Sequence, residues 1–192
     1  INYLGYAVKN PAVTSNAPII NWYIDDADFT DMTTNHVNDN VTFPAVVAYG
    51  DKIFDNSRVR IKGEYSRSFP KKSFKFNLPT GHKINLAGGS NRELDEFHLN
   101  SDYATASIGR TLAAWWVVEQ SGAAVPDISA VRLQRNGQFE GSYIFAEKYK
   151  KEWRQEKGFN NGTLIEDWYE IVMGSDTADR DLWQSHMTLD RK

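Results

Sequence analysis

Two stretches of the chain alternate between apolar and polar residues with a period of two, the spacing of a β-strand that buries one face. They cover residues 59–62 and 73–78. We expect these strands to pair antiparallel and to bury their apolar members, Val59, Ile61, Phe74, Phe76 and Leu78. The opposite face then carries basic side chains, namely Arg58, Arg60, Lys62 and Lys75.

A further hairpin is predicted over residues 130–145, because Asn136-Gly137 separates two alternating segments. Asn-Gly suits the tight turn that matches the twist of paired strands. Short apolar runs at 18–24 and 43–49 predict two more strands. We expect the 130–145 hairpin to join the sheet that the first two strands form.

Two helices are predicted, over residues 103–120 and 147–157. The first carries an apolar stripe and is followed by Gly122, which suits a left-handed helix end: Ile108, Leu112, Trp115 and Trp116. The order of elements predicts an α+β fold, an antiparallel sheet with packed helices. The core should include Phe74, Phe76, Tyr143 and one of Trp115 and Trp116.

Charge is distributed unevenly along a chain whose net charge is −3. Residues 58–75 hold seven basic residues and one acidic residue, which is typical of an anion site. A glycine in the loop 63–70 lets backbone N–H groups approach a phosphate. A solvated sheet face is the alternative, but Lys71 and Lys72 stand beside Arg67 without acidic neighbours. The acidic remainder and a pI of about 5.8 argue against unspecific nucleic-acid binding.

Several other chemistries lack support in the sequence. The chain has no cysteine, and its four histidines form no pair at i, i+4, so a zinc site is not expected. The motifs of serine hydrolases, P-loop proteins and dinucleotide-binding folds do not occur. The acidic run at residues 25–31 reads as a solvated turn. No apolar run is long enough to predict a membrane span.

Four segments, taken in order, resemble the spore-coat protein H (CotH) kinase-like family. Residues 59–75 resemble its Arg-x-Lys/Arg-Gly-x-Ser-Ser/Arg signature followed by Lys-Lys-Ser/Pro-Phe/Tyr. Residues 101–110 resemble its Asp-opened helix, and residues 136–147 resemble its Asn-Gly-x-Tyr-x-Gly-x-Tyr strand ending in Glu. Residues 162–165 are similar to its Gly-x-Leu-Tyr-Lys. The resemblance spans about residues 18–166.

This resemblance implies an atypical protein kinase that uses ATP and Mg²⁺ to phosphorylate coat or surface proteins. It implies a location outside the cell, at the cell surface or in the spore coat. The loop Gly63–Pro70 would cover phosphates, and Glu147 would stand near the adenine. The candidate nucleotide-binding residues are Arg60, Lys62, Gly63, Arg67, Lys71, Lys72, Lys75 and Glu147. We expect Lys72 rather than Lys75 to be the phosphate ligand, because it matches the family's paired lysines, although strand parity alone favours Lys75.

The chain also departs from the family pattern. Ile165 and Glu166 stand where the family has Tyr-Lys, and no later aspartate has the setting of a catalytic or metal-binding residue. No catalytic base or metal ligand is therefore nominated. We expect residues 1–192 to form one domain that resembles the nucleotide lobe of an atypical kinase, with the C-terminal lobe missing or truncated and residues 167–192 unassigned. The alternative is a non-catalytic surface or coat module, structural or adhesive, on the same fold.

Overall fold

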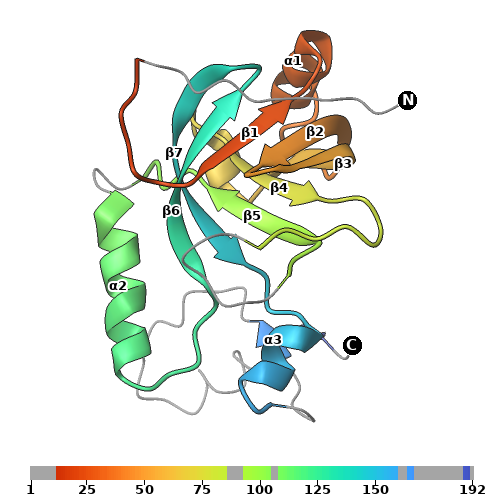
Figure 1. The fold of residues 1–192 in the computed structure, drawn as a ribbon. Coiled ribbons are helices and arrows are strands. Elements are labelled where there is room, and N and C mark those ends of the chain that lie inside the picture. The colour runs from red at the N-terminus through yellow and green to blue at the C-terminus, as the bar shows by residue number, and fades with distance from the viewer. Residues whose placement is uncertain (1–11, 86–92, 105–107, 160–163, 167–187, 191–192) are drawn as a thin grey trace. The chain divides into compact units, whose positions relative to one another are not determined.

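The computed structural model describes residues 12–85, 93–104, 108–159, 164–166 and 188–190. The chain divides into two compact units, residues 1–148 and residues 149–192. The first unit holds a closed β-barrel with two helices, and the second holds a short helix and a two-stranded sheet (Figure 1).

Seven strands form the barrel in the order β1-β2-β3-β4-β5-β7-β6. Neighbouring strands pair antiparallel, except that β1 and β6 pair parallel and so close the barrel. The strands are β1 (Ile19–Tyr23), β2 (Phe43–Tyr49), β3 (Lys52–Lys62), β4 (Ser73–Asn77), β5 (Glu96–Asn100), β6 (Ile128–Arg135) and β7 (Gln138–Glu147).

The strand pairs expected from the alternation are confirmed. β3 and β4 pair antiparallel, with Val59 opposite Phe76 and Ile61 opposite Phe74. The turn between β6 and β7 has a positive φ at both Asn136 (49°) and Gly137 (81°), as a tight turn of this kind requires. The 130–145 hairpin also belongs to the same sheet as β3 and β4.

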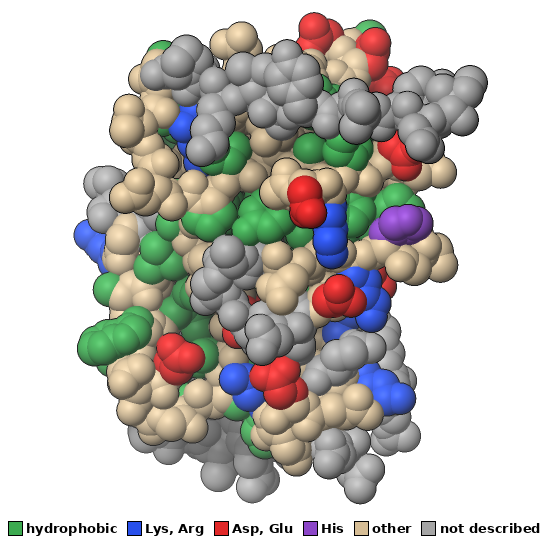
Figure 2. All heavy atoms as spheres, viewed as in Figure 1, with side chains coloured by type: hydrophobic (Ala, Val, Ile, Leu, Met, Phe, Trp, Pro, Cys, Tyr) green, Lys and Arg blue, Asp and Glu red, His purple; other side chains and the backbone are tan. Residues whose placement is uncertain are grey.

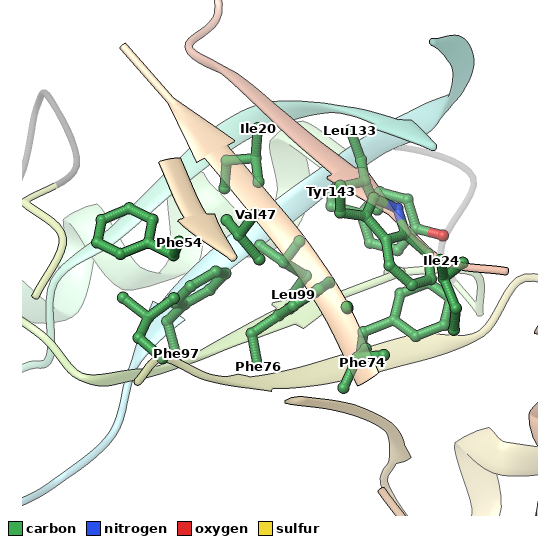
Figure 3. Packing of buried hydrophobic residues seen from close by; sticks show 14 of the residues in the cluster. Ile20, Ile24, Val47, Phe54, Phe74, Phe76, Phe97, Leu99, Leu133 and Tyr143 are labelled. Atoms are coloured by element: carbon green, nitrogen blue, oxygen red, sulfur yellow. The ribbon is translucent and has the colours of Figure 1, made fainter. Parts of the chain in front are cut away.

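The core fills the inside of the barrel with side chains from all seven strands (Figure 3). The largest buried residues are aromatic: Trp22, Phe74, Phe76, Phe97 and Tyr143. The indole N–H of Trp22 donates a hydrogen bond of 2.8 Å to Glu140 Oε2, so the one polar atom of this ring has a partner. The expectation that Phe74, Phe76 and Tyr143 lie in the core is confirmed.

The expected fold class is wrong. The first unit is mostly β and closes on itself, whereas the sequence predicted an α+β sheet with packed helices, as in the nucleotide lobe of an atypical kinase. Closure depends on the parallel pairing of β1 with β6, in which Ile19 lies opposite Arg132, 113 positions away. Alternation within a strand carries no signal for a contact at that separation.

The acidic run does not form the expected turn, because most of it belongs to helix α1 (Asp26–Thr34). Asp25 is its N-cap, and its Oδ1 accepts a hydrogen bond of 2.8 Å from the backbone N–H of Ala27. Asp26 and Asp28 lie in the first turn, where negative charge interacts favourably with the helix dipole. The run is therefore a helix start rather than a loop.

Helix α2 (Ile108–Gln120) is shorter than the predicted span but ends where expected, before Gly122 with its φ of 84°. It contacts β6 and β7 on the outside of the barrel. Trp115 is half-buried and Trp116 is 60% exposed, so the expected core tryptophan is wrong. Hydrophobic side chains gather in Figure 2 along the side where Figure 1 draws α2.

The second unit contains helix α3 (Lys151–Glu156), which is shorter than the predicted 147–157 because β7 runs to Glu147. The rings of Tyr149 and Trp153 contact each other at 4.7 Å, as their spacing predicts. Strands β8 (Leu164–Glu166) and β9 (Thr188–Asp190) pair antiparallel.

Replacing Phe76 by Ala should lower the free energy of unfolding by about 3–5 kcal/mol, because the side chain is fully buried and leaves a cavity. Ile53 on β3, which is 45% exposed, provides a control whose change to Ala should cost less than ~1 kcal/mol. Chemical denaturation of both variants measures the difference. A loss below ~1 kcal/mol for Phe76→Ala would contradict the assigned core.

Candidate functional site

Basic side chains gather on the outer wall of the barrel, over β3, β4, β5 and the end of β7. Arg60 and Lys62 project from β3, and Lys75 lies directly opposite Arg60 on β4. Lys148 follows β7 and reaches the same wall, as its ion pair with Glu96 shows. We call this set the cationic face; its six side chains are Arg60, Lys62, Lys75, Glu96, His98 and Lys148.

Strand parity produces this face. The inner residues of the three strands are apolar, so every second residue points outward. The expectation that Arg60, Lys62 and Lys75 share a face is therefore supported by the register. Glu96 and His98 extend it on β5, where His98 lies directly opposite Lys75.

One carboxylate oxygen, Glu96 Oε1, lies at the centre of the face. Lys75 Nζ lies 3.0 Å away, Lys148 Nζ 3.4 Å away and His98 Nε2 3.8 Å away. The side chains of Lys75 and Glu96 are only 16% and 13% exposed. Within this face, one carboxylate is accompanied by four basic side chains, Arg60, Lys62, Lys75 and Lys148. They are partly buried, where Coulomb interactions are stronger than in water.

Burial shifts the acid–base behaviour of this face. It lowers the pKa of Arg60 and of Lys75, in both cases as the largest cause. It also lowers the pKa of His98 to about 3, with further lowering by Lys62, Lys75 and Lys148 against an opposing effect of Glu96. The imidazole is therefore neutral at physiological pH.

The loop Gly63–Pro70 stands at the end of β3 and contains a 3-10 turn, Tyr65–Ser68. Its Arg67 is occupied by backbone and amide oxygens: the guanidinium donates to the carbonyls of Gly63, Val37 and Asp39 and to Asn40 Oδ1. Arg67 therefore ties the loop to the segment before β2.

Two further lysines of this region also hold backbone oxygens. Lys72 Nζ donates to the carbonyl of Arg67 at 2.7 Å. Lys71 Nζ donates to the carbonyls of Ser101 and Ser142 and lies 4.3 Å from the centre of the Tyr143 ring. These contacts indicate a structural role for both ammonium groups.

Glu147 lies apart from the cationic face. Its side chain is 4% exposed, and Oε2 accepts a hydrogen bond of 3.2 Å from the backbone N–H of Asp127. It shares strand parity with Tyr143 and Phe145 of the core. The eight predicted site residues thus divide into three on the cationic face, four in or beside the loop, and Glu147.

Sequence reasoning missed Glu96, His98 and Lys148. The alternation of Phe97 and Leu99 with polar residues was the available signal for a strand at 96–100. Lys148 had no such signal, because its place depends on the pairing of β5 with β7.

Neither a metal cluster nor a membrane-spanning helix occurs in the part of the chain that the structure describes. No group of three or more His, Asp or Glu residues there could hold a metal ion. No helix there is long and apolar enough to cross a membrane. Among the later aspartates, Asp167, Asp176, Asp179 and Asp181 lie outside the described residues, and Asp190 is the last residue of β9.

Replacing Gly63 by Ala should destabilise the loop. Gly63 has a φ of 103°, and a Cβ there would lie 2.0 Å from Ser66 Oγ. Gly81, with a φ of 80° and open space around it, provides a matched control for the backbone cost alone, about 1–2 kcal/mol. Denaturation should show a larger loss for Gly63→Ala, and Ser66→Ala should relieve the excess. Equal losses at both glycines would contradict this account.

Lowering the pH should reduce the free energy of unfolding more steeply in the wild type than in His98→Gln. The folded pKa of His98, about 3, lies below the ordinary value of 6.5, so the unfolded chain binds a proton first. Stability is therefore lost as pH falls from 6.5 toward 3, by up to about 1.4 kcal/mol per pH unit. Unfolding free energies from pH 7 to pH 4 test this, with the exposed His82→Gln as control. Parallel curves for wild type and His98→Gln would contradict it.

Comparison with known proteins identifies the family of the chain. The sequence profile of the CotH kinase protein family matches residues 59–187, which are 129 of the 192 residues. A search of curated proteins finds no match. The matched segment contains the whole cationic face and the loop Gly63–Pro70. The resemblance predicted from the sequence motifs is confirmed: the chain belongs to the CotH kinase protein family.

Proposed function

We propose that this CotH kinase protein binds ATP with Mg²⁺ and transfers the terminal phosphoryl group to a serine or threonine of a coat or surface protein. The observation that carries the proposal is the cationic face, where four basic side chains accompany one carboxylate. ATP, Mg²⁺ and the class of substrate follow from the family resemblance. A working location at the cell surface or in the spore coat follows from it too.

Phosphoryl transfer depends on positioning the phosphates and neutralising their charge, so it needs several cations in one place. Arg60, Lys62 and Lys75 provide a guanidinium and two ammonium groups on adjacent strands. Each hydrogen bond from such a group to a phosphate contributes roughly 1.5–3 kcal/mol. Because Lys75 is only 16% exposed, its charge is less screened by water than that of a surface lysine.

We assign the phosphates to the cationic face, with Lys75 as the central ligand. Lys62 is the last residue of β3 and immediately precedes Gly63, so the loop Gly63–Pro70 begins beside this face. Lys62 Nζ donates a hydrogen bond of 3.0 Å to Asn100 Oδ1 on β5. When bound, Mg²⁺ would supply further neutralisation of the phosphate charge. Its ligands and the catalytic base stay unassigned.

Replacing Lys75 by Ala in the full chain should weaken ATP affinity by roughly tenfold or more, because one charged hydrogen bond is lost. The double variant Lys75→Ala/Glu96→Gln should lose as much ATP affinity as the single variant. This control shows that the loss comes from the missing ammonium group and not from the negative charge of Glu96, which repels phosphate once Lys75 is gone. Calorimetric titration with ATP and Mg²⁺ measures both affinities.

Lys72→Ala is the matched control. Its ammonium holds the carbonyl of Arg67, so its removal should lower the melting temperature and leave ATP affinity within about twofold. If Lys72→Ala loses ATP and Lys75→Ala does not, the assignment within the basic region is wrong. If the wild-type chain binds no ATP, the kinase proposal fails and the non-catalytic surface or coat module takes its place.

A further inference from the structure

Three aromatic side chains form a patch on the surface of the first unit, where the loop Gly63–Pro70 meets the residues that follow β5. The ring centroids of Tyr65 and Phe69 lie 5.5 Å apart, and those of Phe69 and Tyr103 lie 5.4 Å apart. Tyr65 is 81% exposed, Tyr103 is 49% exposed and Phe69 is half-buried. We call these three residues the aromatic patch. A contiguous group of large exposed apolar side chains is typical of an interaction site.

Several hydrogen bonds hold the loop that carries the patch. Tyr65 begins a 3-10 turn, and the backbone N–H of Phe69 closes that turn on the carbonyl of Ser66 at 3.2 Å. Ser68 Oγ donates a hydrogen bond of 2.8 Å to the carbonyl of Tyr65. Arg67 ties the same turn to the segment before β2. Because the loop is already ordered, a partner that binds the rings loses little free energy to ordering it.

The two tyrosines combine an apolar ring with a hydroxyl group that has no bound partner. In the described part of the chain, no hydrogen bond joins the hydroxyl of Tyr65 or of Tyr103 to another protein group. Side chains of this kind are enriched at protein interfaces, where the ring is covered and the hydroxyl bonds to the partner or to water. The chemistry of the patch therefore suits a polypeptide.

The angles between the rings favour a side chain over a flat ring as the bound group. The planes of Tyr65 and Phe69 meet at 88°, and those of Phe69 and Tyr103 at 39°. The patch therefore lacks the two parallel faces that would enclose a nucleobase. Its angled surface suits an aliphatic, proline or aromatic side chain, which contacts one ring face and one ring edge at once.

The size of the patch favours a short segment over a second copy of the chain. Even if they were covered completely, three aromatic side chains would bury roughly 450–750 Å² in total. A stable interface between two proteins needs about 800 Å² from each of them. The patch alone falls short of that area, and it fits the weak, transient contact of a short extended segment.

Both parts of the patch begin where strands of the cationic face end. Lys62 is the last residue of β3 and Asn100 is the last residue of β5, and a hydrogen bond of 3.0 Å joins their side chains. Tyr65 and Tyr103 follow these two residues by three positions each. Three residues span at most roughly 11 Å, so both tyrosines lie within reach of a phosphate held at Lys62.

We propose that the aromatic patch docks the protein substrate, by binding an apolar side chain that lies within a few residues of the acceptor serine or threonine. This inference rests on the proposed function, because it takes the terminal phosphate to lie at the cationic face. An acceptor hydroxyl must be held against that phosphate, and a segment lying on the patch brings it there. The inference adds a substrate class, namely segments in which an apolar side chain accompanies the acceptor.

Fluorescence polarisation with labelled peptides tests the inference on the full chain. Each peptide has one serine in a background of glycine and glutamine, with one phenylalanine placed in turn at each nearby position. A matched set carries alanine in place of phenylalanine. The wild-type chain should bind the best phenylalanine peptide at least about fivefold more tightly than its alanine match, as expected for an interface anchor.

Tyr65→Ala and Tyr103→Ala should each lose most of that preference, whereas Tyr65→Phe, which retains the ring, should keep most of it. Because Tyr65 is so exposed, Tyr65→Ala should also keep the wild-type melting temperature, which a thermal melt verifies. Trp116→Ala is the matched control, since Trp116 is an aromatic residue of α2 that is 60% exposed and lies outside the patch. It should leave the preference unchanged.

The outcomes separate this inference from the proposed function. The inference alone is wrong if the chain binds ATP but prefers no phenylalanine peptide, or if Trp116→Ala removes the preference as Tyr65→Ala does. Calorimetry should find that Tyr65→Ala leaves ATP affinity within about twofold of the wild type. A larger loss would assign the nucleotide to the patch and overturn the inference. If the wild type binds no ATP, the proposed function fails and the substrate assignment fails with it.

Discussion

The parallel pairing of β1 with β6 is the contact on which the rest of the first unit depends. It joins Ile19–Trp22 to Arg132–Arg135 and turns a row of antiparallel strands into a closed wall. Closure gives the sheet an inside, which the aromatic side chains fill, and an outside, where charge can gather at low cost. The cationic face exists because the alternation that fills the core has a second, outward half.

Local pattern was enough to predict the pairing of β3 with β4 and of β6 with β7, but it predicted neither β5 nor the fold class. The alternation at Val59–Lys62 and Ser73–Leu78 and the Asn136-Gly137 turn each act within a few residues, and the structure agrees with all three. The barrel needs a contact between residues 113 positions apart, for which neither segment carries a local sign. The prediction of a core tryptophan in α2 failed for a related reason. An apolar stripe predicts that one face of a helix is buried, but α2 contacts mainly β6 and β7 among the described strands, and Trp116 remains exposed.

The site was predictable in part. Strand parity correctly grouped Arg60, Lys62 and Lys75, because it depends only on spacing along the chain. Composition alone could not distinguish these residues from Arg67, Lys71 and Lys72, because all six basic residues lie within the same short segment of the sequence. The difference lies in their partners: Arg67, Lys71 and Lys72 hold carbonyl oxygens of the backbone, and Lys75 holds a carboxylate. Such partners become visible only when distant loops are brought together.

Glu96 Oε1 is shared by Lys75, Lys148 and His98, and this sharing has an evolutionary consequence. Groups that interact with one atom do not contribute independently, so the effect of changing one depends on which others are present. A chain that lost Glu96 would be left with crowded amines, and one that lost both lysines would keep a partly buried carboxylate with less positive charge beside it. Substitutions at positions 75, 96, 98 and 148 should therefore be correlated among descendants of this sequence, because a change at one of these positions is tolerated only together with changes at the others.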